Sequence, residues 1–365
     1  MDIKKIVEMG IQGMSGDNCQ PWKFYWDGEV LSLSYLFHVG KHYFNRRNNA
    51  ALISIGTVIE LVQQGAYHQG LETDILLTSG LGIDTGEPWV QFRFRPLPAN
   101  GMSTATTTTK VFSMDTILKR VSHRGMHDGG DLEIPLIRQL AKGFTDLPLI
   151  KVKFTNEWNQ LLLDFIYMCE QSTWANPKGV HDLMPWIRTN KDESVRTRDG
   201  LYWEELGIEK KELPAIKILK KFPGLVGLMF HLGMKQTITQ VTERNLRSSA
   251  GLMTLFTNET TDEAAVQAGR AGMRAMLYLT EANYVGQVMS SMSLSLFDYA
   301  RGAMPADTKE PYLSNFIEGQ KIMQAQYGER DPWIPIWCIR IGKCHQISNV
   351  AKSLRKDISY FLDGV

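Results

Sequence analysis

One stretch of the sequence, residues 15–26, constrains the fold strongly because it joins a polar turn to an aromatic strand. It begins Ser-Gly-Asp-Asn, residues that are small or bond to the backbone through their side chains, which is typical of turns. Trp22 and Phe24 then alternate with other residues, as in a strand with one buried face. The backbone N–H groups of such a turn, with the amides of Asn18 and Gln20, can surround a planar polar ligand. The simpler alternative is a loop that leads into a buried strand and binds nothing.

Composition and charge exclude few classes of protein. The chain has 365 residues, 43% of them hydrophobic and 22% charged, which is enough to bury one large core or two modest ones. Forty basic and thirty-nine acidic residues leave a net charge of +1, so no overall field attracts nucleic acid or an anionic membrane. We therefore expect a globular protein whose partners are small molecules.

Cysteine spacing and apolar runs indicate the compartment. The four cysteines lie far apart or in no zinc-like spacing, which is typical of reduced thiols. Residues 1–14 resemble an amphipathic helix and lack the features of a signal peptide. The longest apolar run, residues 222–234, is shorter than the ~20 residues of a membrane span. His123 and His127 share helical spacing but have no convincing third metal ligand. We expect a cytoplasmic protein without a metal site.

Hydrophobic spacing predicts alternating helices and hairpins in the first part of the chain. The predicted elements are helices at residues 3–14 and 50–70 and strands within 22–35, at 73–77 and at 89–94. Asp27-Gly28 is the turn signal of the first hairpin, and Gly56 would allow a neighbour to approach the second helix closely. The Gly-Leu-Gly at residues 80–82 precedes a strand, which indicates a hairpin turn and not a dinucleotide-binding loop. Residues 97–110 are the best candidate linker.

A second polar motif follows this linker. Residues 115–124 are predicted to form a helix that ends with Arg120, Ser122 and Arg124. Two guanidinium groups and a hydroxyl at this spacing can converge on a phosphate dianion. The alternative is a solvated basic helix end. Farther on, we expect strands at residues 249–257 and 336–341.

The pattern S-x-x-N-x-Q-P-W-x-F at residues 15–24 resembles the signature of the FMN-dependent nitroreductase superfamily. The resemblance implies an α+β nitroreductase-like fold and one non-covalently bound FMN. It places the flavin ring against Ser15, Gly16, Asp17, Asn18 and Gln20. The R-x-S-x-R pattern of residues 120–124 is similar to the element that holds the FMN phosphate in this superfamily.

In most members of that superfamily the phosphate element comes first in the chain, whereas here it comes second. The order is explained if the chain contains two fused related halves that form a pseudo-dimer, most like the Acg-type nitroreductase-like proteins. We place the halves at residues 1–105 and 106–365, the second with a lid-like insertion at 170–245. A plain surface subdomain is the alternative for the insertion.

The same resemblance suggests further site residues. A helix at residues 264–283 would bring Arg270 to the flavin ring, and a loop at 286–293 would carry Ser290 and Ser291 past the reactive face. The proline and glutamate usual in that loop are absent, which puts the typical hydride-donor site in doubt. Lys352 and Arg355, on a basic turn near the C-terminus, would close the phosphate site. For each of these the alternative is an ordinary solvated or structural residue.

The function expected from this resemblance is hydride transfer from NAD(P)H through FMN to an electron-poor small-molecule acceptor, with no catalytic side chain identified. A flavin-sequestering or storage protein without turnover is the main alternative. A partner-binding protein that has lost flavin is a weaker one. The assembly is expected to be a monomeric pseudo-dimer or a homodimer.

Overall fold

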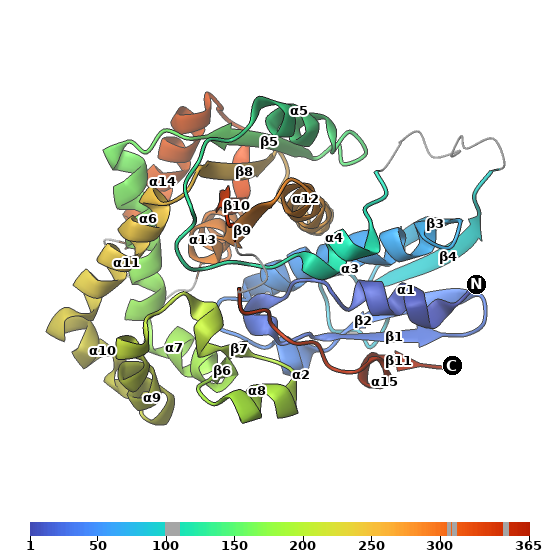
Figure 1. The fold of residues 1–365 in the computed structure, drawn as a ribbon, viewed down its shortest axis with the longest axis horizontal. Helices are drawn as coiled ribbons and strands as arrows, with labels where there is room; N and C mark the ends of the chain where they lie inside the picture. The colour runs from blue at the N-terminus through green and yellow to red at the C-terminus, as the bar shows by residue number, and fades with distance from the viewer. Residues whose placement is uncertain (99–109, 305–307, 309–311, 346–349) are drawn as a thin grey trace.

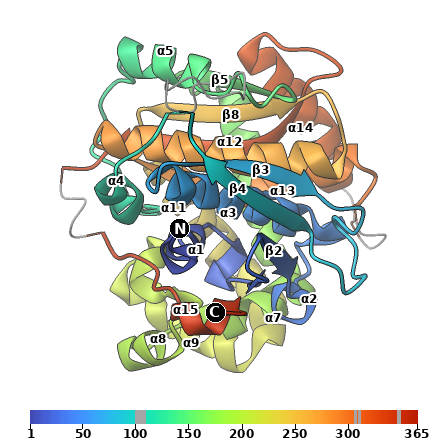
Figure 2. The same cartoon turned by 90° about the vertical axis from the view of Figure 1, so that its right-hand side faces the viewer.

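The computed structural model describes residues 1–98, 110–304, 308, 312–345 and 350–365, and combines helices with two larger, mainly antiparallel sheets and a small parallel pair of strands. Two long helices, α3 (Asn49–Tyr67) and α12 (Asp262–Glu281), pack against each other in the middle of the molecule. Each lies on a different sheet, so the layers run sheet, helix, helix, sheet (Figures 1 and 2). The helices and sheets of the first 98 residues agree with those expected from the sequence.

The first sheet has the strand order β11-β1-β2-β4-β3. Its strands are β1 (Trp22–Trp26), β2 (Val30–Tyr35), β3 (Leu71–Leu77), β4 (Val90–Pro96) and β11 (Leu362–Asp363). Both predicted hairpins are confirmed, and Gly28 has the positive φ that the first turn requires. Trp22 and Phe24 are buried beneath α1 (Ile3–Gly10) and α3. The C-terminal strand β11 pairs in parallel with β1, so the chain end returns to its first strand.

The second sheet has the strand order β5-β8-β10-β9, and all its pairs are antiparallel. Its strands are β5 (Ile150–Thr155), β8 (Gly251–Thr257), β9 (Tyr284–Val288) and β10 (Ile334–Lys343). Every residue of β8 is buried, which explains its mainly apolar sequence. Helix α12 covers one face, and α13 (Ser290–Ala300) and α14 (Tyr312–Tyr327) also pack on this sheet.

Close backbone contact between α3 and α12 depends on two glycines. A Cβ on Gly56 would lie 2.1 Å from the carbonyl oxygen of Val266, and one on Gly269 would lie 2.0 Å from that of Ile53. The expectation that Gly56 allows a close neighbour is therefore confirmed, and the neighbour is the central helix of the second sheet. The helices also share a buried ion pair, with Arg274 Nε 2.7 Å from Glu60 Oε1.

Residues between α6 and α11 form a mainly helical group at one end of the molecule, in yellow-green in Figure 1. Its elements are α6 (Gln160–Ala175), α7 (Pro177–Leu183), β6 (Ile187–Arg188), α8 (Lys191–Thr197), β7 (Leu201–Tyr202), α9 (Leu213–Lys221), α10 (Val226–Met229) and α11 (Lys235–Arg247). Val180, Ile187 and Leu219 belong to a small hydrophobic core of its own. The remaining short helices of the described chain are α2 (Phe37–Gly40), α4 (Met114–Lys119), α5 (Ile134–Lys142) and α15 (Ile358–Phe361).

Two local expectations were wrong. The helix predicted over residues 115–124 ends at Lys119, because Ser122 forms a parallel bridge with Gly286 and the N–H of His123 donates to the carbonyl of Gly286 at 3.0 Å. The R-x-S-x-R motif therefore lies in an extended segment beside the second sheet. The loop expected at residues 286–293 is instead the end of β9 followed by the first turn of α13. Most of the candidate linker, residues 99–109, lies outside the described residues.

In the part of the chain that the structure describes, no helix has the length and apolar character needed to cross a bilayer.

Candidate functional site

A cavity of about 830 Å³ lies where the first sheet, the second sheet and the helical group from α6 to α11 meet. Its wall includes Ser15, Gly16 and Asp17 from the turn after α1. Ser122 and Arg124 join it from the segment after α4, and Ser290 and Ser291 from the start of α13. Seven of the residues singled out from the sequence thus face one space, although they come from three distant parts of the chain.

The turn between α1 and β1 has a strained backbone. Asp17, Asn18 and Gln20 have φ values of 50°, 54° and 54°, in the left-handed region that non-glycine residues avoid at a cost of roughly 1–2 kcal/mol each. The Ser15 hydroxyl accepts the N–H of Gln20 at 3.0 Å and closes the turn. This conformation directs Asp17 and the Gly16 backbone toward the cavity and the two amides away from it.

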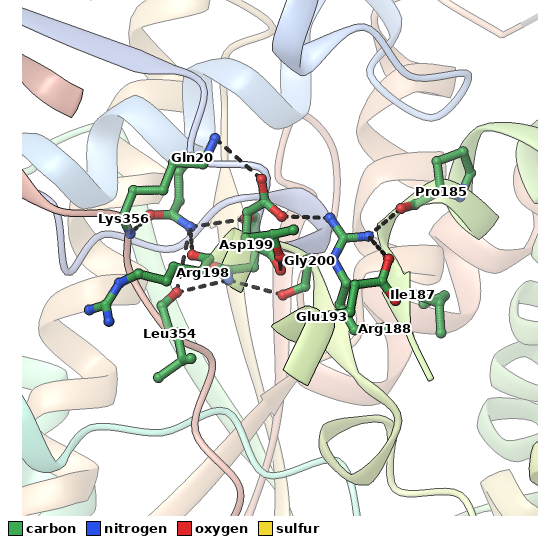
Figure 3. Close-up of polar contacts among 12 residues, drawn as sticks. Gln20, Pro185, Ile187, Arg188, Glu193, Arg198, Asp199, Gly200, Leu354 and Lys356 are labelled. Carbon is green, nitrogen blue, oxygen red and sulfur yellow. Dashed lines mark hydrogen bonds and ion pairs between the residues drawn. The ribbon is translucent and has the colours of Figure 1, made fainter. Parts of the chain in front are cut away.

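The amides of Asn18 and Gln20 hold two remote segments together, and Figure 3 shows the contacts of Gln20 with Arg198 and Lys356. Asn18 Nδ2 donates to the carbonyls of Gly200 and Leu354, both at 3.0 Å. Gln20 Nε2 donates to Arg198 O at 2.8 Å, and Gln20 Oε1 accepts the N–H of Lys356 at 3.0 Å. Neither residue is among the described residues that line the cavity. Their amide groups are engaged with backbone atoms, in contrast to the expectation that they contact a ligand directly.

An ionic group supports this junction. Asp199 accepts from Arg188 Nη2 at 2.5 Å and lies 3.2 Å from Lys356 Nζ (Figure 3). Arg188 also donates to the carbonyl of Pro185. Through these contacts the segment that holds Pro185, Arg188 and Asp199 is connected to the chain end at Lys356.

Charged groups gather at the polar end of the cavity. Burial raises the pKa of Asp17, although the neighbouring His42 and Arg124 oppose the shift. His42 Nε2 lies 3.3 Å from Asp17 Oδ2. Burial lowers the pKa of Arg124, whose Nη1 donates to Glu205 O at 3.2 Å. Arg124 therefore presents a buried cation to the cavity.

A second group of polar side chains faces the cavity near α13. Burial raises the pKa of Glu170, a residue of α6 on the cavity wall, while a hydrogen bond from Ser291 and the charge of Arg340 oppose the shift. Arg340 lies on β10 and donates to Gln287 Oε1 at 3.0 Å and 2.7 Å. Burial lowers the pKa of Arg340 to about 9.

Arg120, Lys352 and Arg355 form a cationic cluster beside the cavity wall. Burial lowers the pKa of Arg120 to about 9, that of Lys352 to about 8 and that of Arg355 to about 10. Repulsion from Arg355 adds to the shifts of both Arg120 and Lys352. Glu205 is the counter-charge felt by Arg355, and burial raises the pKa of Glu205 itself. The cluster thus holds more positive than negative charge.

Backbone carbonyls at the end of α1 satisfy part of this cluster. Arg355 donates to Ile11 O and Gly13 O, each at 3.0 Å, and Arg120 Nη2 donates to Gln12 O at 2.9 Å. Arg120 Nε is buried and finds no partner among the described residues. An unpartnered buried N–H within a net positive cluster fits a bound anion. The structure thus brings Lys352 and Arg355 to Arg120, as expected, while Arg124 points into the cavity.

Arg270 lies elsewhere. Its Nη2 donates to Gln63 Oε1 at 2.9 Å, and its guanidinium is 3.4 Å from Glu60 and 3.6 Å from Asp146. It is not among the described residues of the cavity wall. The reason is that α3 carries Glu60, a buried carboxylate that the sequence analysis did not recognise and that attracts the arginines of α12.

His42, Glu205 and Gln287 could not be predicted from the sequence, because they are isolated polar residues with no motif around them. Within the described residues, no group of three or more His, Cys, Asp or Glu side chains is arranged to hold a metal ion.

Comparisons with known proteins find similarity only among solved structures. No protein-family model matches the chain, and no curated protein matches it. A nitroreductase with bound FMN from Desulfitobacterium hafniense DCB-2 is 10% identical, with a TM-score of 0.36 over 69% of this chain and 97% of its own. A nitroreductase with bound FMN from Bacteroides fragilis is 9% identical, with a TM-score of 0.34 over 67% and 93%.

The FMN-dependent nitroreductase NfnB from Mycobacterium smegmatis, in complex with NADPH, is 12% identical, with a TM-score of 0.35 over 67% of this chain and 94% of its own. TM-scores at this level are too low to assign the chain to a family.

Proposed function

We propose that this protein binds FMN non-covalently and transfers hydride from NAD(P)H to an electron-poor small molecule. The observation that carries the proposal is the common cavity wall of Ser15–Asp17, Ser122, Arg124, Ser290 and Ser291. The motif resemblance predicts that these stretches contact one flavin, and their common position on one cavity wall supports that prediction. Their convergence from three parts of the chain is difficult to explain by three unrelated loops.

The cationic residues fit the phosphate of FMN. Arg124 and Ser122 offer donors from the cavity wall, and Arg120, Lys352 and Arg355 hold excess positive charge beside it. A phosphate dianion would relieve the repulsion among these cations, and each charge-assisted hydrogen bond would contribute roughly 1.5–3 kcal/mol. Asn18 and Gln20 would act indirectly, by keeping the turn in the conformation that presents Gly16 and Asp17.

The chain's own residues would position the ring and the proton. FMN, when bound, supplies the two-electron chemistry. The Gly16 backbone and the hydroxyls of Ser15 and Ser290 would donate to its polar edge, while the Ser291 hydroxyl donates to Glu170. Glu170, whose pKa burial raises, would hold a proton at its carboxyl group on the same wall. Trp174 and Trp186 of the insertion would exclude water.

We further propose that residues 1–105 and 106–365 are fused related halves, with residues 170–245 as an insertion. Each half contributes a long central helix, α3 or α12, and an antiparallel sheet. The proposed flavin site draws residues from both halves. A monomeric chain would therefore bind one FMN. Size-exclusion chromatography with light scattering would measure the mass of the particle, and flavin absorbance would measure the number of FMN molecules per chain.

A flavin-sequestering protein without turnover is the second candidate function. It is favoured by the insertion residues Trp174, Trp186 and Leu206 on the cavity wall, because side chains that cover a flavin also restrict access of a second substrate.

One experiment tests both functions. The purified protein is titrated with FMN, separated from free FMN and treated with NADPH or NADH under anaerobic conditions. Bleaching of the 450-nm region would support the oxidoreductase, and bound flavin that stays oxidised would support sequestration. A folded protein that retains no FMN would contradict both.

A further inference from the structure

The cavity continues beyond its polar end into the insertion. There the wall includes five apolar residues, Ile216 and Leu219 of α9, Met229 of α10, and Ile238 and Val241 of α11, beside Thr237 and Thr242 of α11. We call these five residues and the space they enclose the apolar chamber. The polar groups discussed above come from other elements, so the cavity has two ends of different chemistry.

The chamber has the properties of a ligand site and not of a hydrated channel. Aliphatic side chains offer water no hydrogen-bond partners, so the part of the wall that they form favours an apolar ligand over water. The total volume of about 830 Å³ lies toward the upper end of the ~300–1,000 Å³ found for small-molecule sites.

The cavity reaches the surface at Leu232, which lines it and is 76% exposed. Leu232 lies in a π-helical turn, Phe230–Met234, in which the helical path between α10 and α11 breaks at Gly233, with φ of 118°. Leu228 and Phe222 nearby in sequence are 58% and 52% exposed. Clustered exposed apolar residues are typical of ligand-binding or interaction surfaces, and π-turns within helices are frequent at functional sites.

We propose that the apolar chamber binds the hydrocarbon chain of a single-chain amphiphile taken from solution. The chain enters past Leu232 and lies between α9 and α11, and the head group points toward the polar end of the cavity. This inference does not depend on the flavin, because every residue of the chamber belongs to the insertion and contributes no donor to the phosphate or ring sites proposed above.

The test uses the full chain without FMN. The neutral fluorophore N-phenyl-1-naphthylamine is bound first and then displaced by a series of straight-chain alcohols from hexanol to tetradecanol. Apparent affinity is expected to rise about threefold to fourfold per methylene, the usual gain for burial of one CH₂ group, and then to level off when the chamber is full. A rise without a plateau, or no saturable fluorescence, would overturn the proposal, since surface adsorption has no length limit.

Filling the chamber provides the matched variants. Ala215 lines the cavity on α9, whereas Lys217 on the same helix is exposed. Ala215→Trp is expected to lower the affinity for the longest bound alcohol at least tenfold, and Lys217→Trp is expected to leave that affinity unchanged. Val241→Phe fills the chamber from α11 and is measured beside Ala215→Trp, with circular dichroism to establish that each variant is folded. Equal effects of Ala215→Trp and Lys217→Trp on alcohol affinity would contradict the proposal that the alcohol binds in the apolar chamber.

A final measurement separates this inference from the proposed function. The alcohol series is repeated with saturating FMN. The affinity reached at the plateau is expected to change less than twofold. Complete displacement of the alcohol by FMN would show that the two ligands share one space and would overturn the separate chamber. If FMN does not bind at all, the proposed flavin function fails, while the affinity plateau measured without FMN still tests the apolar chamber.

Discussion

Arg355 Nη1 donates to Asn18 Oδ1 at 2.6 Å, and this bond joins the C-terminal segment to the turn between α1 and β1 across 337 positions of sequence. The same Asn18 side chain donates to Gly200 of the insertion. One amide therefore connects the first sheet, the insertion and the cationic cluster. The position of the candidate phosphate-binding residues depends on a side chain that does not itself face the cavity.

Asn18→Asp is expected to destabilise the fold. The substitution keeps an oxygen for Arg355 but removes the Nδ2 donor, so the carbonyls of Gly200 and Leu354 lose a partner. Each lost buried bond costs about 1–3 kcal/mol in the free energy of unfolding, measured by urea denaturation. Asn156→Asp, at an exposed position, is the control. Equal stability of the two variants would mean that the junction contributes little.

Gly56→Ala is expected to separate α3 from α12. The new Cβ would lie 2.1 Å from Val266 O, a backbone atom that cannot rotate away, so the helices must move apart. Overpacking of this kind costs about 1–3 kcal/mol or more. Gly227→Ala in α10 is the matched control, because a Cβ there meets no atom within 4 Å and alanine favours a helix. A thermal melt should show a lower Tm for the first variant and an equal or higher Tm for the second.

The free energy of unfolding is expected to fall as the pH rises from about 4 to 6, because of Asp298. Burial raises the pKa of this carboxyl to about 6, while Arg46, 2.9 Å away, and Asn49 oppose the shift. The folded protein then binds a proton more tightly than the unfolded chain, whose Asp pKa is near 3.9. The resulting stability is present below about pH 4 and lost as pH rises through 6, by about 3 kcal/mol at most.

Asp298→Asn removes this titration. The difference in unfolding free energy between the protein and the variant should therefore change with pH within that window and stay constant above it. A constant difference from pH 4 to pH 7 would mean that Asp298 stays ionised in its contact with Arg46.

Arg124→Ala is expected to weaken FMN binding about 10- to 100-fold, since the variant loses a charge-assisted contact worth roughly 1.5–3 kcal/mol. Arg124→Lys should lose less affinity, because the charge remains while the planar fork of donors is gone. Arg138→Ala, at an exposed position of α5, is the control. Fluorescence quenching of FMN measures the affinities, and unchanged binding by Arg124→Ala would remove this residue from the site.

Lys352→Met is expected to have opposite effects on the empty and the loaded protein. Burial and the charges of Arg120 and Arg355 lower the pKa of Lys352 to about 8, so its cationic form is destabilised when no anion is present. Loss of this charge should leave the stability of the flavin-free protein equal or higher and should reduce FMN affinity. Lys4→Met, in an exposed position of α1, is the control. A variant that is destabilised and binds FMN normally would show that Lys352 is structural.

Local elements of the fold were predictable because their signals lie within a few residues of sequence. The Asp27-Gly28 turn set the first hairpin, and the apolar spacing after Ala50 set α3. The helix expected to continue through Arg124 failed for the opposite reason. Its end is determined by Gly286, a partner more than 160 positions away, and helical spacing carries no information about such pairing.

By itself, the sequence determined β1 to β4, β8 and β10, the two central helices and the candidate residues of the turn at 15–20 and the segment at 120–124, because turn chemistry and hydrophobic period are local properties. It did not determine β5, β9 or β11, whose pairing depends on distant strands. Only the tertiary structure decided which of those residues face the cavity. Arg124 and Arg120 lie four residues apart, yet one lines the cavity and the other joins Lys352 and Arg355. Arg270 forms an ion pair with Glu60 and does not line the cavity. The direction of a charged side chain depends on the burial and charges that surround it, and those are supplied by segments distant in sequence.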